Sequence, residues 1–235
     1  NSIAQALASS RTGSIGIIVP ELGGPFYSGI LHSMEERLRR FGYHVVVTAG
    51  SNSEQSQRES VEFLLGRRVD AIILHAQNLT DDYLIDLKEK GIPVVLVNRF
   101  IPEMAQCCIE IDNEFGGQLA TEYLLRMGHR NIACITGPLD KSDARGRLQG
   151  YRKALEEAGI EYDEALVSEA GFTEESGESA MRKLLKRDCH FTAVFACNDH
   201  MAFGAYEVLK ANGVNVPEQI SLVGFDDILF ARYLT

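Results

Sequence analysis

Short, continuously apolar runs alternate with longer amphipathic segments along the chain, and this alternation constrains the fold more than any other feature. Each apolar run has the composition of a parallel strand that is covered on both faces. We expect strands at residues 15–19, 44–48, 71–74, 93–97, 132–136, 192–196 and 221–224. We expect helices at 27–41, 53–65, 82–90, 115–127, 148–158, 176–186 and 201–211. This order predicts a doubly wound α/β fold with parallel sheets.

The pattern occurs twice, with a break near Asp112. Four expected strands precede this residue and a similar set follows Asn131. We therefore expect two similar lobes, at residues 13–112 and 113–235, preceded by a separate short segment at residues 1–12. Loops that leave the carboxyl ends of parallel strands commonly form a ligand site. The sequence thus predicts a small-molecule cleft between the two lobes.

Charge and composition exclude several classes of protein. The chain of 235 residues carries 23 Lys and Arg against 33 Asp and Glu, a net charge of −10, which disfavours direct binding to a phosphate backbone. Residues 1–8 lack the basic flank and long apolar stretch of a secretory signal, and no apolar run is long enough to cross a membrane. The five cysteines include no CxxC pair, which favours reduced thiols. We expect a cytoplasmic protein without a membrane partner.

Motifs for enzymatic or cofactor chemistry are missing from the sequence. It contains no GxxxxGK[ST] phosphate loop, no GxSxG elbow and no HExxH zinc motif. The loop after residues 15–19 contains Pro25, Phe26 and Tyr27 instead of the glycines that a dinucleotide requires. The six histidines lack the spacing of metal ligands and suit surface or capping positions. We expect no catalytic residues, no cofactor and no metal.

Polar and aromatic residues follow the expected strands at their carboxyl ends. They include Asn98, Arg147, Phe172, Asn198 and Asp226. Carboxylates accept the hydroxyl groups of a sugar, Arg and Asn donate hydrogen bonds, and an aromatic ring covers an apolar sugar face. This combination predicts a polyhydroxylated ligand.

Plainer interpretations exist for each of these residues. Asn198 suits the N-cap of a helix, Arg147 could form a surface pair with Asp143, and Phe26 and Phe172 could be ordinary core residues. The neighbouring Asp226 and Asp227 could suggest acid–base chemistry, although adjacent side chains usually point apart. No single residue indicates a ligand site, but the placement of all of them at the ends of expected strands does.

Several motifs, in this order along the chain, resemble the LacI/GalR family of transcriptional regulators. They are Asn1-Ser-Ile-Ala-Gln-Ala-Leu, Ile15-Gly-Ile-Ile-Val-Pro, Leu124-Leu-Arg-Met-Gly-His-Arg-Asn-Ile-Ala, Arg147-Leu-Gln-Gly-Tyr, Thr192-Ala-Val-Phe-Ala-Cys-Asn-Asp-His-Met-Ala-Phe-Gly-Ala and Ser221-Leu-Val-Gly-Phe-Asp-Asp. The stretches around Asn98, Cys108 and Asp226 look most similar to the galactose repressor and isorepressor branch.

The resemblance implies a periplasmic-binding-protein-like core and assigns roles to particular residues. The effector contacts would be Phe26, Tyr27, Asn98, Arg147, Phe172, Asn198 and Asp226. Asn98 stands where many relatives have aspartate. Residues 1–12 would be a hinge helix and linker, with Ile3, Ala4 and Leu7 at the DNA minor groove, where the leucine unstacks a base step.

The same resemblance implies a cytoplasmic homodimeric repressor that binds operator DNA and responds to a monosaccharide, with galactose or a related hexose as inducer. The helix-turn-helix headpiece and the C-terminal remainder of the family would lie outside this chain. Three alternatives stay open. The chain could be a periplasmic-type sugar-binding protein, a family regulator that responds to another sugar or a purine, or a small α/β enzyme that uses Asp226 or Cys197.

Overall fold

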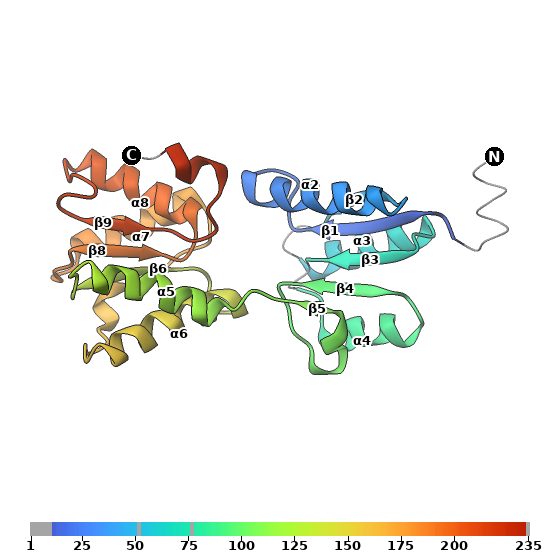
Figure 1. Ribbon diagram of the computed structural model, residues 1–235, viewed down its shortest axis with the longest axis horizontal. Coiled ribbons are helices and arrows are strands. Elements are labelled where there is room, and N and C mark those ends of the chain that lie inside the picture. The colour runs from blue at the N-terminus through green and yellow to red at the C-terminus, as the bar shows by residue number, and fades with distance from the viewer. Residues whose placement is uncertain (1–10, 51–52, 76–77, 234–235) are drawn as a thin grey trace. The chain divides into compact units, whose positions relative to one another are not determined.

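The computed structural model describes residues 11–50, 53–75 and 78–233, and the expected hinge residues Ile3, Ala4 and Leu7 lie outside this part. The chain divides into two compact units, the first ending at Ile111 and the second beginning at Asp112. In each unit helices pack on a sheet of parallel strands (Figure 1). The expected fold class is confirmed.

The first unit contains a five-stranded parallel sheet with the strand order β2-β1-β3-β4-β5. Its elements are β1 (Ser14–Val19), α2 (Pro25–Arg40), β2 (His44–Ala49), α3 (Glu54–Gly66), β3 (Ala71–Leu74), α4 (Asp81–Glu89), β4 (Val94–Val97), η1 (Pro102–Cys107) and β5 (Cys108–Ile109). Residues 15–19 of β1 are all buried, as expected for an inner strand of a parallel sheet. Because the strands are parallel, their carboxyl ends share one edge, where α2 begins and Asn98 follows β4.

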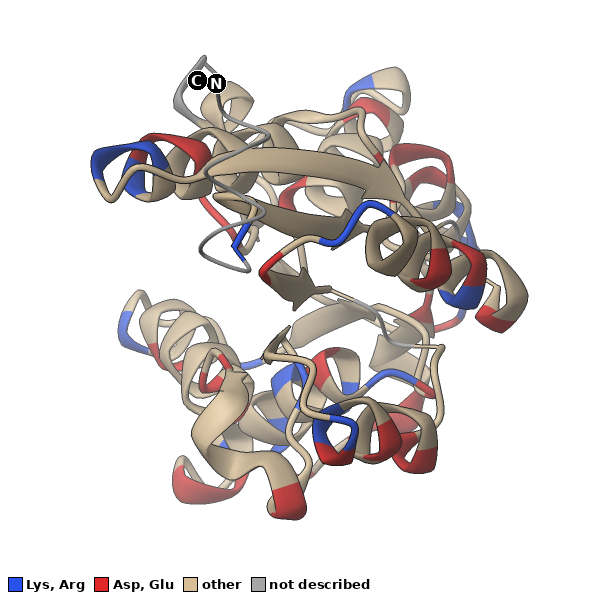
Figure 2. Cartoon of the chain, turned by 90° about the vertical axis from the view of Figure 1, so that its right-hand side faces the viewer, with Lys and Arg blue, Asp and Glu red and all other residues tan. Residues whose placement is uncertain are grey.

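The second unit contains a four-stranded parallel sheet with the strand order β7-β6-β8-β9. Its elements are α5 (Asn113–Arg126), β6 (Ile132–Thr136), α6 (Ser142–Glu157), η2 (Glu164–Leu166), β7 (Val167–Glu169), α7 (Glu174–Lys186), β8 (Ala193–Ala196), α8 (Asp199–Ala211), β9 (Ser221–Val223) and η3 (Leu229–Tyr233). All residues of β6 and β8 are buried. Charged residues lie mainly on the helices and loops, while most strands carry none (Figure 2).

Glycines bring two pairs of helices in the second unit into close contact. A Cβ atom at Gly150 of α6 would lie 2.0 Å from the carbonyl oxygen of Glu114 in α5, and one at Gly204 of α8 would lie 2.0 Å from that of Glu174 in α7. A larger residue at either position would push the helices apart. This close packing holds the first turn of α5 beside the middle of α6, and the first turn of α7 beside the middle of α8.

The expected strands are confirmed to within one residue at each end, and the expected helices to within two, with one exception. The start at Leu148 is wrong for α6, which begins at Ser142, so Asp143 and Arg147 lie inside the helix rather than in a loop after β6. No side chain caps this helix at Lys141, and the usual N-terminal signal is therefore missing. The short strands β5 and β7 were not expected, because two or three residues are too few for a periodic pattern.

Candidate functional site

The carboxyl edge of the second sheet brings together the four predicted effector residues of this unit. Asn198 and Asp226 follow β8 and β9 through short loops, and Phe172 follows β7. Arg147 reaches the same place from the second turn of α6 and contacts residues of both loops. The predicted clustering of Arg147, Phe172, Asn198 and Asp226 is therefore observed within this unit.

Arg147 is the centre of the cluster, and its side chain is only 6% exposed. Its Nε donates to Oδ1 of Asn113 at 2.9 Å, and its Nη1 donates to the carbonyl oxygen of Cys197. Its Nη2 lies 3.7 Å from Oδ1 of Asp226. This burial excludes the interpretation of Arg147 as a surface residue. The three contacts orient a planar group with several donors at the carboxyl edge of the sheet.

Aromatic rings lie against the Arg147 guanidinium. The Phe225 ring centroid is 3.8 Å from its Cζ atom, and the Phe172 centroid is 6.0 Å away. The Phe172 ring also packs over Gly137, where a Cβ atom would lie 2.2 Å from the ring. The cluster thus combines charged donors with apolar surfaces, the combination that a sugar ring requires.

Asp226 is a buried carboxyl group with a perturbed acidity. Burial raises its pKa from 3.8 to about 7; the positive charge of Arg147 opposes this shift and the negative charge of Asp199 adds to it. A carboxyl group that titrates near neutral pH is typical of a functional site. When ionised, it can accept hydroxyl groups of a ligand beside the Arg147 donors.

Asn198 makes two hydrogen bonds that order the local structure. Its Oδ1 accepts the backbone N–H of Met201 at 2.9 Å and so caps α8, which confirms the N-cap interpretation. Its Nδ2 donates to the carbonyl oxygen of Phe172 at 3.0 Å. Asn198 therefore also holds the loop that carries the Phe172 ring.

Strained backbone conformations coincide with the predicted effector residues. Among the described residues, five that are not glycine have positive φ: Arg68, Asn98, Phe172, Asp226 and Asp227. Three of them, Asn98, Phe172 and Asp226, were selected from the sequence for other reasons. Such conformations cost of order 1–3 kcal/mol each and cluster at functional sites, so this coincidence independently supports the assignment.

The first unit places its three predicted residues at the carboxyl edge of its own sheet. Phe26 and Tyr27 lie in the first turn of α2, which begins at Pro25, and their rings pack edge to face with centroids 5.1 Å apart. Asn98 directly follows β4, and its backbone N–H donates to the carbonyl oxygen of Ile109 at 2.8 Å. The local placement agrees with the sequence analysis.

Some residues of these clusters were missed from the sequence. His75 was assigned to the surface or to a cap, but it is buried, and its ring lies 5.3 Å from that of Tyr27. Its position directly after a predicted strand was the available signal. Phe225 and Asn113 were also missed, because their contacts with Arg147 join segments that lie far apart in the sequence.

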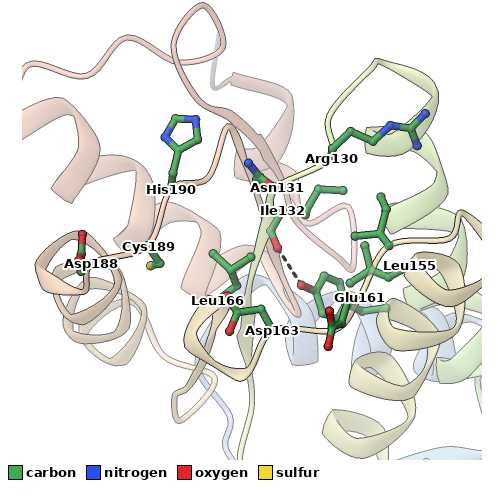
Figure 3. Close-up of a pocket in the computed structure, with 12 residues that line it drawn as sticks. Arg130, Asn131, Ile132, Leu155, Glu161, Asp163, Leu166, Asp188, Cys189 and His190 are labelled. Atoms are coloured by element: carbon green, nitrogen blue, oxygen red, sulfur yellow. Dashed lines mark hydrogen bonds between the residues drawn. The ribbon is translucent and has the colours of Figure 1, made fainter.

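A separate cavity of about 420 Å³ lies at the opposite edge of the second sheet, where β6 begins (Figure 3). Its inner wall includes Ile132, Tyr151 and Leu155, and the Tyr151 hydroxyl donates to the carbonyl oxygen of Ile132 at 2.8 Å. Arg130 and Asp188 extend outward from this wall. The lining also includes charged and polar residues, among them Arg130, Glu161 and Asp188. The carboxyl edge is the better candidate because the loops that follow parallel strands converge there.

A metal site and a membrane span are both absent from the described residues. No three His, Cys, Asp or Glu side chains in this part of the chain are grouped closely enough to hold a metal ion. Within the same residues, no helix combines the length and apolar composition that a membrane span requires. All five cysteines are free thiols, and Cys134 and Cys197 are buried with their Sγ atoms 3.9 Å apart.

Comparisons with known proteins extend over nearly the whole chain. Residues 12–232 match the family described as "Periplasmic binding proteins and sugar binding domain of LacI family". The HTH-type transcriptional regulator GalR of Escherichia coli (strain K12) is 38% identical over 234 residues, which cover 100% of this chain and 68% of that protein. The HTH-type transcriptional repressor PurR of Pasteurella multocida (strain Pm70) is 36% identical, over 99% of this chain and 70% of that protein.

A solved structure agrees with these relatives. The complex of the transcriptional regulator CelR with cellobiose has a TM-score of 0.84 and 38% identity, and the match covers 98% of this chain and 74% of that chain. These relatives are transcriptional regulators rather than enzymes, in agreement with the absence of catalytic motifs from the sequence. The chain belongs to the LacI/GalR family, and it forms the sugar-binding core of a transcriptional regulator.

Proposed function

We propose that this core binds a monosaccharide, galactose or a related hexose, and thereby controls the affinity of a repressor for its operator. The observation that carries the proposal is the buried contact between Arg147 and Asp226, flanked by Phe172 and Phe225. Paired donors and acceptors beside aromatic faces recognise a ring that has hydroxyl groups on its rim and C–H groups on its faces.

The first unit supplies the second half of the proposed effector site. Phe26 and Tyr27 provide aromatic surface, and Asn98 provides an amide in a strained conformation. An effector that contacts both units favours one arrangement of them over another, by no more than its difference in affinity for the two. Such a coupling is typically 1–3 kcal/mol per site, and it can act in either direction on DNA binding.

The proposal includes a cytoplasmic homodimer that reaches DNA through the hinge. The net charge of −10 disfavours DNA contact by the core itself. Ile3, Ala4 and Leu7 would meet the minor groove, and this assignment stays a prediction because these residues lie outside the described part. Sedimentation of the protein and binding of operator DNA with and without effector test these two points.

Two of the matched proteins support other classes of effector. Among the matched proteins are a regulator solved with cellobiose and a regulator named PurR. A related site could therefore bind a disaccharide or a purine. Titration calorimetry with D-galactose, D-glucose, D-ribose, cellobiose, guanine and hypoxanthine separates these possibilities.

Two pairs of matched variants locate the binding. Arg147→Lys keeps the charge but removes the planar fork, so the bound effector should lose roughly tenfold or more in affinity. Arg145→Lys is the control, because Arg145 is exposed on the same helix. Asp226→Asn should weaken binding strongly, while Asp227→Asn, at an exposed neighbour, should not. Equal effects within either pair would contradict the assignment.

A further inference from the structure

Asp199 is a buried carboxylate that the effector assignment does not include. It is the first residue of α8, and it is only 5% exposed. An acidic residue in the first turn of a helix is usually explained by the helix dipole and faces water. This one instead faces the loop of residues 224–228, which carries Asp226.

The carboxylate contacts both ends of that loop. Its Oδ2 accepts the backbone N–H of Ile228 at 2.8 Å, and the carboxylate also accepts the backbone N–H of Phe225. A Cβ atom at Gly224 would lie 2.2 Å from its Oδ1, so the loop approaches the carboxylate closely enough to require glycine there. A single side chain thus spans the loop from residue 224 to residue 228.

The loop needs such an anchor because of its own conformation. Asp226 has a φ of 103° and Asp227 has a φ of 51°, both unfavourable for residues with a Cβ atom. The same conformation places the Phe225 ring against the Arg147 guanidinium and the Asp226 carboxylate near its Nη2. The two hydrogen bonds to Asp199 fix both ends of the loop and offset part of the cost of this conformation.

We propose that Asp199 is a positioning residue of the effector site, which holds the 224–228 loop so that Asp226 and Phe225 face Arg147. The inference rests on the proposed role of Asp226 in effector binding. Asp199 also acts through its charge, because it lies among the groups that set the pKa of Asp226. The others are Arg147 and Asp143 of α6 and His200 of α8.

The test compares Asp199→Asn with wild type. The amide keeps the shape of the carboxylate, but it has one acceptor where there were two, and its NH₂ group opposes a backbone N–H. By hydrogen exchange measured with NMR, the Phe225 and Ile228 amides should lose roughly tenfold or more in protection, the scale for a lost charged hydrogen bond. By ¹³C titration of side-chain carboxyl groups, the pKa of Asp226 should fall, because a neighbouring negative charge is gone.

Asp163→Asn is the matched control. Asp163 also accepts a backbone N–H, from Ala165 at 2.8 Å, and so caps η2. It lines the separate cavity at the opposite edge of the sheet from the effector residues. This variant should leave both the exchange of Phe225 and Ile228 and the pKa of Asp226 unchanged. General destabilisation would lower protection throughout the second unit, whereas loss of positioning is confined to Phe225 and Ile228, so the pattern of exchange distinguishes the two.

A measurement on the wild-type protein covers the case in which Asp199→Asn does not fold. The amide proton shifts of Phe225 and Ile228 should follow the titration of the Asp199 carboxyl group. Independence of these shifts from Asp199, or an unchanged Asp226 pKa in a folded Asp199→Asn, would overturn the proposal. Neither readout needs a ligand, so a failure of D-galactose to bind would count against the proposed function alone.

Discussion

At the residue scale, the chemistry of the site depends on the desolvation of Asp226. In the folded protein this carboxyl group has a pKa of about 7, well above the value of 3.8 for a free side chain. The folded state therefore holds the proton more tightly than the unfolded chain does. Its contribution to stability is fully present below pH 4 and is lost as the pH rises toward 7.

This shift predicts a pH-dependent affinity for the effector. The ionised carboxylate is the form that accepts hydroxyl groups, so affinity should rise as the pH increases from 6 to 8 and then level off. Calorimetric titrations at several pH values measure the midpoint. In Asp226→Asn the remaining affinity should show no such midpoint. A flat profile in the wild-type protein would contradict the role of Asp226.

We expect the Asp226→Asn substitution to weaken effector binding but to increase stability at alkaline pH. At pH 8 Asp226→Asn removes a buried charge, so it should raise the free energy of unfolding by about 1–3 kcal/mol, given 1.36 kcal/mol for each pKa unit. At pH 5 the variant should have little effect, because Asp226 is then protonated. Urea unfolding at both pH values tests the difference, with Asp227→Asn as the control. A loss of stability at pH 8 would mean that the contact with Arg147 outweighs the desolvation of the carboxylate.

At the element scale, the helix pairs of the second unit determine where Arg147 lies. Gly150→Ala would place a methyl group 2.0 Å from the Glu114 carbonyl oxygen, so α6 would have to move away from α5. We expect a loss of about 2–4 kcal/mol in the free energy of unfolding, as for other overpacked sites. We also expect weaker effector binding, because Arg147 of α6 would separate from Asn113 of α5.

Gly66→Ala is the control for this prediction. Gly66 is the last residue of α3, and a Cβ atom there would have no neighbour within 4 Å. Alanine at this position should be neutral or raise the free energy of unfolding by up to about 1 kcal/mol. Comparable losses in both variants would show that the contact between α5 and α6 is not the cause.

At the scale of the whole molecule, an effector that both units bind should slow hydrogen exchange in both. Hydrogen exchange with saturating ligand should show added protection near Tyr27 and Asn98 in the first unit and near Phe172, Asn198 and Asp226 in the second. Ligand at 100 times its dissociation constant should also add about 2.7 kcal/mol to the free energy of unfolding. Protection confined to the second unit would contradict a shared site.

The sequence was sufficient for much of the fold because the relevant signals are local. Apolar runs such as residues 15–19 and 132–136 identify buried strands by composition alone. Gly42 and Gly91 follow helical segments, where glycine is favoured, and the structure gives both a positive φ. The start of α6 could not be found in this way, since Lys141 gives no capping signal. His75 was assigned to the surface or to a cap, and Asp199 was given no role, because neither type of residue reveals its burial in a sequence.

The sequence by itself determined the order of strands and helices, the fold class, the family and most of the residues that gather at the strand ends. These properties follow from periodicity, turn chemistry and motifs, which act over a few neighbouring residues. Only the tertiary structure decided the state of those residues. The guanidinium of Arg147 is oriented by Asn113, Cys197 and Asp226, and the pKa of Asp226 is raised by burial among α6, α8 and the β9 loop. Desolvation and hydrogen bonds between segments distant in sequence arise only when the chain is folded.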